Sequence, residues 1–181
     1  MVKILIAEIA SKSIEKKLQV SFKKAYSLGL RPNHLTLSQL PIVMLMIWFA
    51  YNKSLWEVII LSLVMVFIDL FDGIFARATN SYTKLGHLYD KGMDLLSIIS
   101  LAFSIGLIFP ATMKISITLI ITTIILYVLN EKTKTELWGG SRVIIPIGAI
   151  FNQVGVAVSL SLITTILAIS YSGFKLLKKK W

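Results

Sequence analysis

Residues 69–94 carry the stretch that decides the fold, and they read DLFDGIFARATNSYTKLGHLYDKGMD. Four of these residues are aspartates, although the whole chain has only nine Asp and Glu against nineteen Lys and Arg. The surrounding sequence is apolar. A carboxylate at the centre of a bilayer costs about 2.5–3.5 kcal/mol, so four cost on the order of 10 kcal/mol unless something compensates them. Divalent metal ions would compensate, because hard cations prefer carboxylate oxygens.

Composition predicts an all-α membrane protein. The chain has 181 residues, 56% of them hydrophobic, and a mean hydropathy of +0.78, which is too apolar for a soluble domain of this size. A membrane-spanning helix needs about 20 apolar residues. We expect a single domain over 1–181, with a juxtamembrane region at 1–30 and six transmembrane helices within 31–181. The expected spans are 35–51, 55–77, 84–108, 112–130, 141–154 and 156–174. Cysteine is absent, which excludes disulfide and thiolate chemistry.

The distribution of positive charge predicts the orientation. Six spans place both termini on one side, and sixteen of the nineteen basic residues fall on that side. The other side has two, Lys53 and Lys114, and Lys91 lies within the third span. The positive-inside rule therefore predicts cytoplasmic termini in the cell membrane. The net charge of +10 is explained by loop position, so we do not expect a nucleic-acid partner. The sixteen are Lys3, Lys12, Lys16, Lys17, Lys23, Lys24, Arg31, Arg77, Lys84, Lys132, Lys134, Arg142, Lys175, Lys178, Lys179 and Lys180.

Residues 12–26 are predicted to form an amphipathic helix that precedes the first span. Its apolar side chains recur at helical spacing, and its lysines fall on the opposite face. Such a helix lies in the headgroup layer of an anionic leaflet. The alternative is a solvated helix that packs on the core. The apolar face holds Ile14, Leu18, Phe22, Ala25 and Tyr26.

Helical periodicity predicts where the aspartates meet. Asp69 and Asp72 are three residues apart and share a face of the second span, whereas Asp90 and Asp94 are four apart and share a face of the third. The connection at 78–83 is short, so the two spans are expected to be antiparallel neighbours. Both pairs then lie at one depth, just inside the cytoplasmic surface. Four carboxylates suit Mg²⁺ or Mn²⁺, and two ions can share bridging carboxylates.

Two neighbouring residues favour a phosphate ligand at this place. Gly73 has no side chain, which allows a ligand to approach the helix, and Arg77 can hold a phosphate. Two alternatives are open. The carboxylates could pair structurally with bases, but the nearby Arg77, Lys84 and Lys91 are fewer than the four acids. A cation channel or transporter is the other, yet the cluster lies at one membrane edge and no later span has a matching acid.

These residues also carry a family resemblance. The pattern D-x₂-D-G-x₂-A-R-x₈-G-x₃-D-x₃-D resembles the signature of the CDP-alcohol phosphotransferases at every fixed position and spacing. Residues 32–36, which read PNHLT, are similar to the P-N-x-x-T segment that opens the first span in many members. The matching positions of the signature are Asp69, Asp72, Gly73, Ala76, Arg77, Gly86, Asp90 and Asp94.

The resemblance implies a phospholipid-synthesis enzyme that binds one or two Mg²⁺ or Mn²⁺ ions and works as a homodimer. It transfers a substituted phosphate from a CDP-linked lipid to an acceptor hydroxyl, and CMP leaves. By analogy Asp69, Asp72 and Asp90 bind metal, while Asp94 is both a ligand and the general base. A water-soluble CDP-alcohol donor, or a metal-binding transporter, is the alternative. The residues implied to contact the CDP-alcohol are Asn33, Thr36, Asp69, Asp72, Gly73, Ala76, Arg77, Thr83 and Gly86.

The acceptor is expected to be a small polar molecule, and a polyol phosphate is the leading candidate. Such an acceptor needs extra cations beside the metal, and Lys132, Lys134 and Arg142 lie together in the loop between the fourth and fifth spans. The same three charges are equally well explained by the positive-inside rule. His34 and His87 are not assigned a role, because a single histidine beside a turn more often packs locally.

Overall fold

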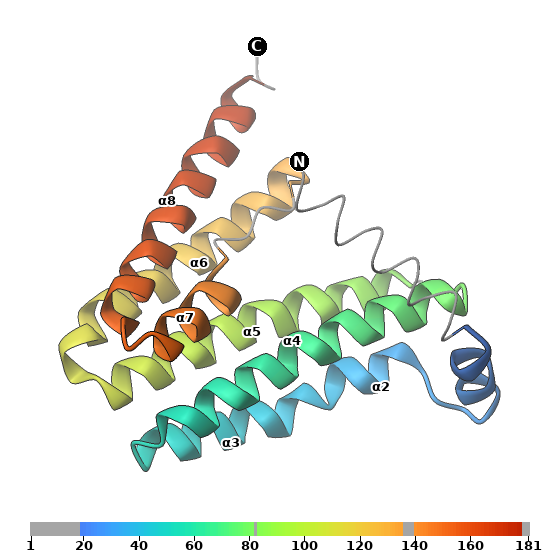
Figure 1. Ribbon diagram of the computed structural model, residues 1–181. Helices are drawn as coiled ribbons and strands as arrows, with labels where there is room; N and C mark the ends of the chain where they lie inside the picture. The colour runs from blue at the N-terminus through green and yellow to red at the C-terminus, as the bar shows by residue number, and fades with distance from the viewer. Residues whose placement is uncertain (1–18, 82, 136–139, 179–181) are drawn as a thin grey trace. The chain divides into compact units, whose positions relative to one another are not determined.

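The computed structural model describes residues 19–81, 83–135 and 140–178, and in these ranges the chain is helical with no strand (Figure 1). Residues 19–27 form a first helical segment. The helices that follow are α2 (Pro32–Leu37), α3 (Gln39–Tyr51), α4 (Leu55–Ala78), α5 (Lys84–Ile108), the short 3₁₀ helix η1 (Pro110–Thr112), α6 (Met113–Thr133), α7 (Ser141–Ile150) and α8 (Val154–Lys178).

Within the described parts of the chain, five helical stretches are long and apolar enough to cross a membrane, by length and composition. The 24 residues of α4 extend about 36 Å at 1.5 Å per residue, which exceeds the roughly 30 Å of a hydrocarbon core. The predicted spans at 55–77 and 84–108 match α4 and α5 to within one residue. The five stretches are Pro32–Tyr51, Leu55–Ala78, Lys84–Ile108, Pro110–Thr133 and Val154–Lys178.

The predicted fifth span at 141–154 corresponds to a shorter helix. Helix α7 has ten residues, about 15 Å, and ends where Asn152 adopts a left-handed conformation with φ of 55°. The predicted span therefore extends past the end of the helix into the turn at 151–153. The expected count of six spans is therefore not confirmed: the structure has five candidates and one shorter apolar helix among the described residues.

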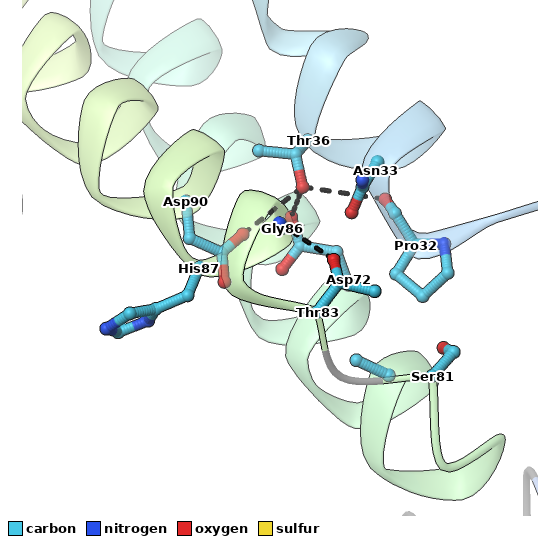
Figure 2. A pocket seen from close by; sticks show the side chains of 10 residues that line it. Pro32, Asn33, Thr36, Asp72, Ser81, Thr83, Gly86, His87 and Asp90 are labelled. Carbon is cyan, nitrogen blue, oxygen red and sulfur yellow. Dashed lines mark hydrogen bonds between the residues drawn. The ribbon is translucent and has the colours of Figure 1, made fainter.

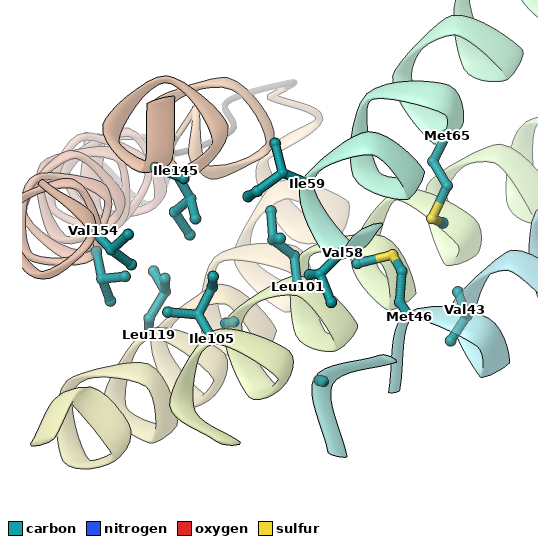
Figure 3. Close-up of a cluster of buried hydrophobic side chains, with 14 residues drawn as sticks. Val43, Met46, Val58, Ile59, Met65, Leu101, Ile105, Leu119, Ile145 and Val154 are labelled. Carbon is teal, nitrogen blue, oxygen red and sulfur yellow. The ribbon is translucent and has the colours of Figure 1, made fainter. Parts of the chain in front are cut away.

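The chain divides into two compact units. One comprises Met1–Leu40 and Val66–Met93, and the other comprises Pro41–Met65 and Asp94–Trp181. In the second unit, α6 and α7 both pack against α8. A Cβ added to Gly148 of α7 would lie 2.2 Å from the Cβ of Ala157 on α8, so this glycine permits the close approach. The buried apolar core of this unit includes Met46, Ile59, Leu101, Leu119, Ile145 and Val154 (Figure 3).

The first unit includes the described part of the predicted amphipathic helix. Residues 12–18 of that prediction lie outside the described residues, whereas 19–27 are helical. Phe22 and Tyr26 are half-buried and Lys23 and Lys24 are exposed, so the two predicted faces differ as expected. The aromatic side chains pack against Phe75 of α4. The location of this segment at a membrane surface stays a prediction.

Candidate functional site

A pocket in the first unit gathers side chains from three helices and one connection (Figure 2). Helix α2 contributes Pro32, Asn33 and Thr36, α4 contributes residues of its last two turns, and α5 contributes residues of its first two turns. The short connection predicted at 78–83 brings the ends of α4 and α5 together here. The lining residues are Pro32, Asn33, Thr36, Asp72, Ala76, Ser81, Thr83, Gly86, His87 and Asp90.

Thr36 links two of the predicted metal ligands. Its hydroxyl donates to Oδ2 of Asp72 at 2.7 Å and also faces Oδ1 of Asp90 at 3.2 Å. Thr36 and Asp72 are both only 2% exposed. A hydroxyl has a single proton to donate and carries no charge, so Thr36 leaves the negative charge of the two carboxylates uncompensated. The buried Asp72 and the half-buried Asp90 converge on one hydroxyl, which indicates a place that favours additional positive charge.

Asp69 belongs to the same acidic group. Its carboxylate is close enough to repel both Asp72 and Asp90. In their present arrangement, no three Asp, Glu or His side chains of the described residues could hold a metal ion. The chemistry of the donors nevertheless fits a hard divalent cation, since three carboxylates and a hydroxyl supply oxygen ligands.

Glycine positions allow the pocket walls to approach closely. A Cβ at Gly86 would lie 2.9 Å from Oδ1 of Asn33 and 3.0 Å from Oγ1 of Thr83. Thr83 also accepts the backbone N–H of Gly86 at 2.9 Å, which caps the start of α5. A Cβ at Gly73 would lie 3.5 Å from the guanidinium of Arg77. The structure thus brings Asn33, Thr83 and Gly86 together, and it places Arg77 over Gly73.

Asp94 belongs to the second compact unit. Its carboxylate forms an ion pair with the guanidinium of Arg142 at the start of α7. Both side chains are largely buried, at 21% and 16% exposure. Asp94, the predicted general base, is therefore in direct contact with Arg142, which is predicted to bind the acceptor phosphate. No sequence pattern indicates this pairing, because the two residues are 48 positions apart.

The two lysines of the predicted acceptor group have a different environment from Arg142. Lys132 and Lys134 are exposed at the C-terminal end of α6, where Lys134 adopts φ of 53°. Beside them is a buried polar group that sequence reasoning missed. Thr135 donates to Oδ1 of Asn130 at 2.8 Å and lies 3.3 Å from the hydroxyl of Ser172 on α8. This group fixes the end of α6 against α8.

Two further pocket residues were also missed. His87 and Ser81 line the pocket, although no sequence pattern assigns either of them a role. The imidazole of His87 is exposed and points away from Thr36 (Figure 2). The sequence feature that could have indicated a role for His87 is its position directly after Gly86 and three residues before Asp90.

Known proteins with similar sequences are enzymes of phospholipid synthesis by name. Archaetidylinositol phosphate synthase of Pyrococcus horikoshii is 34% identical over 94 residues, which are 52% of this chain and 50% of the relative. CDP-diacylglycerol–glycerol-3-phosphate 3-phosphatidyltransferase of Aquifex aeolicus is 34% identical over 76 residues, 40% of this chain and 43% of the relative. The chain thus matches about half the length of these curated relatives.

Solved structures with the same fold come from phosphatidylinositol phosphate synthase of Mycobacterium tuberculosis. The apo form has a TM-score of 0.76 at 14% identity and covers 86% of this chain and 94% of its own. The form with CDP-DAG bound has a TM-score of 0.75, also at 14% identity, and the match covers 87% of this chain and 92% of that structure's chain. At this identity the likeness establishes the fold alone.

The family follows from a match over most of the chain. The model of the CDP-alcohol phosphatidyltransferase family matches residues 30–175, a range that includes the whole aspartate motif and the pocket. Together with several long apolar helices, this match makes the chain a multi-pass membrane protein. The protein belongs to the CDP-alcohol phosphatidyltransferase family.

Proposed function

We propose that this protein is a membrane transferase of phospholipid synthesis. It moves a substituted phosphate from a CDP-linked alcohol to the hydroxyl of a polar acceptor and releases CMP. The convergence of Asp72 and Asp90 on the Thr36 hydroxyl, inside a pocket lined by motif residues, is the observation that carries this proposal. Family membership and a neighbour in the fold that was solved with CDP-DAG bound support it.

The proposal includes one or two divalent ions, Mg²⁺ or Mn²⁺. These ions would be bound by Asp69, Asp72 and Asp90. Asp94, which lies one helical turn after Asp90 in α5, would be a further ligand. The mutual repulsion of the first three carboxylates supports this set, and so does a protein of the same fold that was solved with manganese. When bound, such ions neutralise the pyrophosphate and the charge that develops during transfer.

The residues of the chain would divide the remaining work. Asp94 accepts the proton of the acceptor hydroxyl, whose oxygen forms a bond to the β-phosphorus of the CDP-alcohol. The bond from that phosphorus to CMP breaks, and CMP leaves with the electron pair. Arg77 pairs with donor phosphate oxygens as a charged donor. The other contacts to the CDP group come from Asn33, Thr36, Gly73, Ala76, Thr83 and Gly86.

The finer substrate assignments are also proposals. The donor is a CDP-linked lipid with diacyl or archaeal ether chains, and the acceptor is a polyol phosphate. Arg142 binds the acceptor phosphate together with Lys132 or Lys134. The contact between Arg142 and Asp94 supports this role, because it puts a cation beside the base that the acceptor hydroxyl must reach.

A product screen tests the reaction. Purified protein in vesicles receives CDP-diacylglycerol or CDP-archaeol with glycerol phosphate, inositol phosphate, serine or inositol, and products are identified by mass spectrometry. We expect CMP and one phosphodiester product, activity lost with EDTA and restored by Mn²⁺ or Mg²⁺. Absence of CMP release with every pair would favour a transporter. Turnover of CDP-linked soluble alcohols alone would overturn the lipid donor.

Topology and assembly need separate measurements. We propose that both termini face the cytoplasm and that the protein is a homodimer. Because the chain has no cysteine, Lys132→Cys and Lys114→Cys each introduce a single thiol. A membrane-impermeant reagent added to intact cells should label Lys114→Cys and not Lys132→Cys. Mass photometry in nanodiscs should give twice the 20.2 kDa chain mass after correction for the disc.

A further inference from the structure

An aromatic group joins the N-terminal segment to the motif helix. The ring of Phe22 stacks on Phe75 with centroids 5.0 Å apart and 23° between planes. Tyr26 meets the same ring edge-on at 6.5 Å and 90°. Phe75 is 1% exposed and lies on α4 three residues after Asp72. The segment at 19–27 is therefore attached to the turn of α4 that follows a pocket carboxylate.

Arg31 connects this group to the pocket. Its guanidinium carbon lies 3.8 Å from the centroid of the Tyr26 ring, which is cation–π distance. Arg31 directly precedes α2. Its backbone N–H donates to Nδ1 of His34 at 3.4 Å, and its carbonyl accepts the N–H of His34 at 3.0 Å. The side chain of Arg31 is thus held by the N-terminal segment, while its backbone forms the first turn of α2.

The turn that Arg31 begins supplies pocket residues. Asn33 lies against Gly86, and Thr36 donates to Asp72. The segment from Phe22 to Thr36 consequently contacts α4 twice, at Phe75 and at Asp72, which are one helical turn apart. Because the segment is attached to α4 at both places, these contacts together fix the position of the first turn of α2. If the aromatic contacts of the N-terminal segment are lost, the hydrogen bonds between the turn and the pocket must hold the turn without them.

We propose that Tyr26 and Arg31 are positioning residues for the CDP-alcohol donor: the ring of Tyr26 holds Arg31, and Arg31 holds the Pro32–Thr36 turn so that Asn33 and Thr36 face the pocket. This inference rests on the proposed function. Neither residue touches the reacting atoms, so their loss weakens donor binding rather than the transfer step. We expect no such effect from Lys24, an exposed cation on the same segment that is not part of this cation–π pair.

Four variants of the full chain in vesicles test this. Tyr26→Leu removes the ring, Tyr26→Phe keeps it, Arg31→Gln removes the cation, and Lys24→Gln removes a neighbouring exposed cation. Donor KM, acceptor KM and kcat are measured from CMP release, and CDP binding is measured by calorimetry. Tyr26→Leu and Arg31→Gln should each raise the donor KM and weaken CDP affinity by about two- to fivefold, as expected for an exposed cation–π pair, with kcat and acceptor KM unchanged. Tyr26→Phe and Lys24→Gln should match the wild type.

Three results would overturn the inference while leaving the proposed function intact. One is an unchanged CDP affinity in Tyr26→Leu while Arg31→Gln binds weakly, because Arg31 would then contact the donor directly. Another is an equal loss in Tyr26→Phe and Tyr26→Leu, which would assign the effect to the hydroxyl. The third is a fall in kcat together with both KM effects, which indicates general disruption. A wild type that neither binds CDP nor releases CMP would overturn the proposed function and this inference together.

Discussion

The guanidinium of Arg142 forms an ion pair with the carboxylate of Asp94. The pair ties the start of α7 to α5 within the second unit. Removing one partner of a largely buried pair leaves the other charge without its counter-ion, which is unfavourable. The pair also places the candidate base beside the candidate phosphate-binding cation. Substitution of Arg142 should therefore affect both the affinity for the acceptor and the chemical step.

The first prediction concerns Arg142. Arg142→Ala should raise the acceptor KM by about tenfold or more and also lower kcat, because Asp94 loses its partner. The donor KM should change little. Arg142→Lys keeps the positive charge but loses the forked guanidinium. Its acceptor KM and kcat should therefore lie between those of the wild type and those of Arg142→Ala. Lys114→Ala, which removes an exposed charge at the start of α6, is the matched control. An equal rise of donor and acceptor KM, or rapid turnover of an uncharged alcohol, would contradict the acceptor-phosphate role.

The second prediction separates Asp94 from the other aspartates. Asp94→Asn should lose most turnover but still bind the CDP-alcohol, because three carboxylates remain to hold metal. The asparagine oxygen can still accept a hydrogen bond from Arg142, so the local structure is kept. Asp69→Asn and Asp72→Asn should instead lose Mn²⁺ and donor binding together. Paired calorimetry and CMP release measure both properties for each variant. Near-normal CMP release in Asp94→Asn would show that another group is the base.

The third prediction concerns the hydroxyl of Thr36. Thr36→Val keeps the shape but leaves Asp72 and Asp90 without their shared donor. A hydrogen bond to a charged group contributes about 1.5–3 kcal/mol, and because this one orients carboxylates of the proposed donor site, its loss should lower donor affinity by about tenfold or more. Thr36→Ser retains the hydroxyl and should behave like the wild type. CDP binding in the presence and absence of Mn²⁺ is the measurement. Equal affinities for the valine and serine variants would remove Thr36 from the site.

Much of the fold follows from local signals in the sequence. The bounds of α5 were predicted correctly, because the polar connection ends at Thr83, whose hydroxyl caps the helix, and the apolar pattern begins directly after it. Helix α7 was predicted too long. Hydropathy does not distinguish the helical Ile150 from Phe151 in the following turn, since both are apolar. The turn becomes visible only through the left-handed conformation of Asn152.

The site could be predicted only in part. Spacing predicts that Asp72 and Asp90 lie on helix faces that meet, and in the structure both line one pocket. Spacing does not specify side-chain rotamers, so it could not indicate that the Thr36 hydroxyl stands between the two carboxylates. Contacts between distant segments, such as Arg142 with Asp94 or Tyr26 with Phe75, depend on tertiary packing. A single sequence carries no periodic signal for them.

The last prediction uses two glycines of the same helix. In a helix interior, Gly→Ala stabilises by about 1 kcal/mol when the new methyl group has space. A Cβ at Gly92 meets no atom within 4 Å, so Gly92→Ala should raise the unfolding temperature and leave the kinetics unchanged. A Cβ at Gly86 would lie 2.9 Å from the Asn33 amide and 3.0 Å from the Thr83 hydroxyl, so one or both must move. Because both line the pocket, Gly86→Ala should raise the donor KM and leave the acceptor KM unchanged.

Both variants are compared with the wild type in thermal unfolding and in CMP release. Adding Asn33→Ala to Gly86→Ala separates crowding from other effects of the methyl group. If the methyl group acts by displacing the Asn33 amide, the donor KM of the double variant should equal that of Asn33→Ala alone, because the displaced group is already gone. A further rise in the double variant would mean that the methyl group blocks the donor itself or displaces Thr83. A donor KM of wild-type size in Gly86→Ala would show that the close approach of α2 and α5 at this glycine is not needed for donor binding.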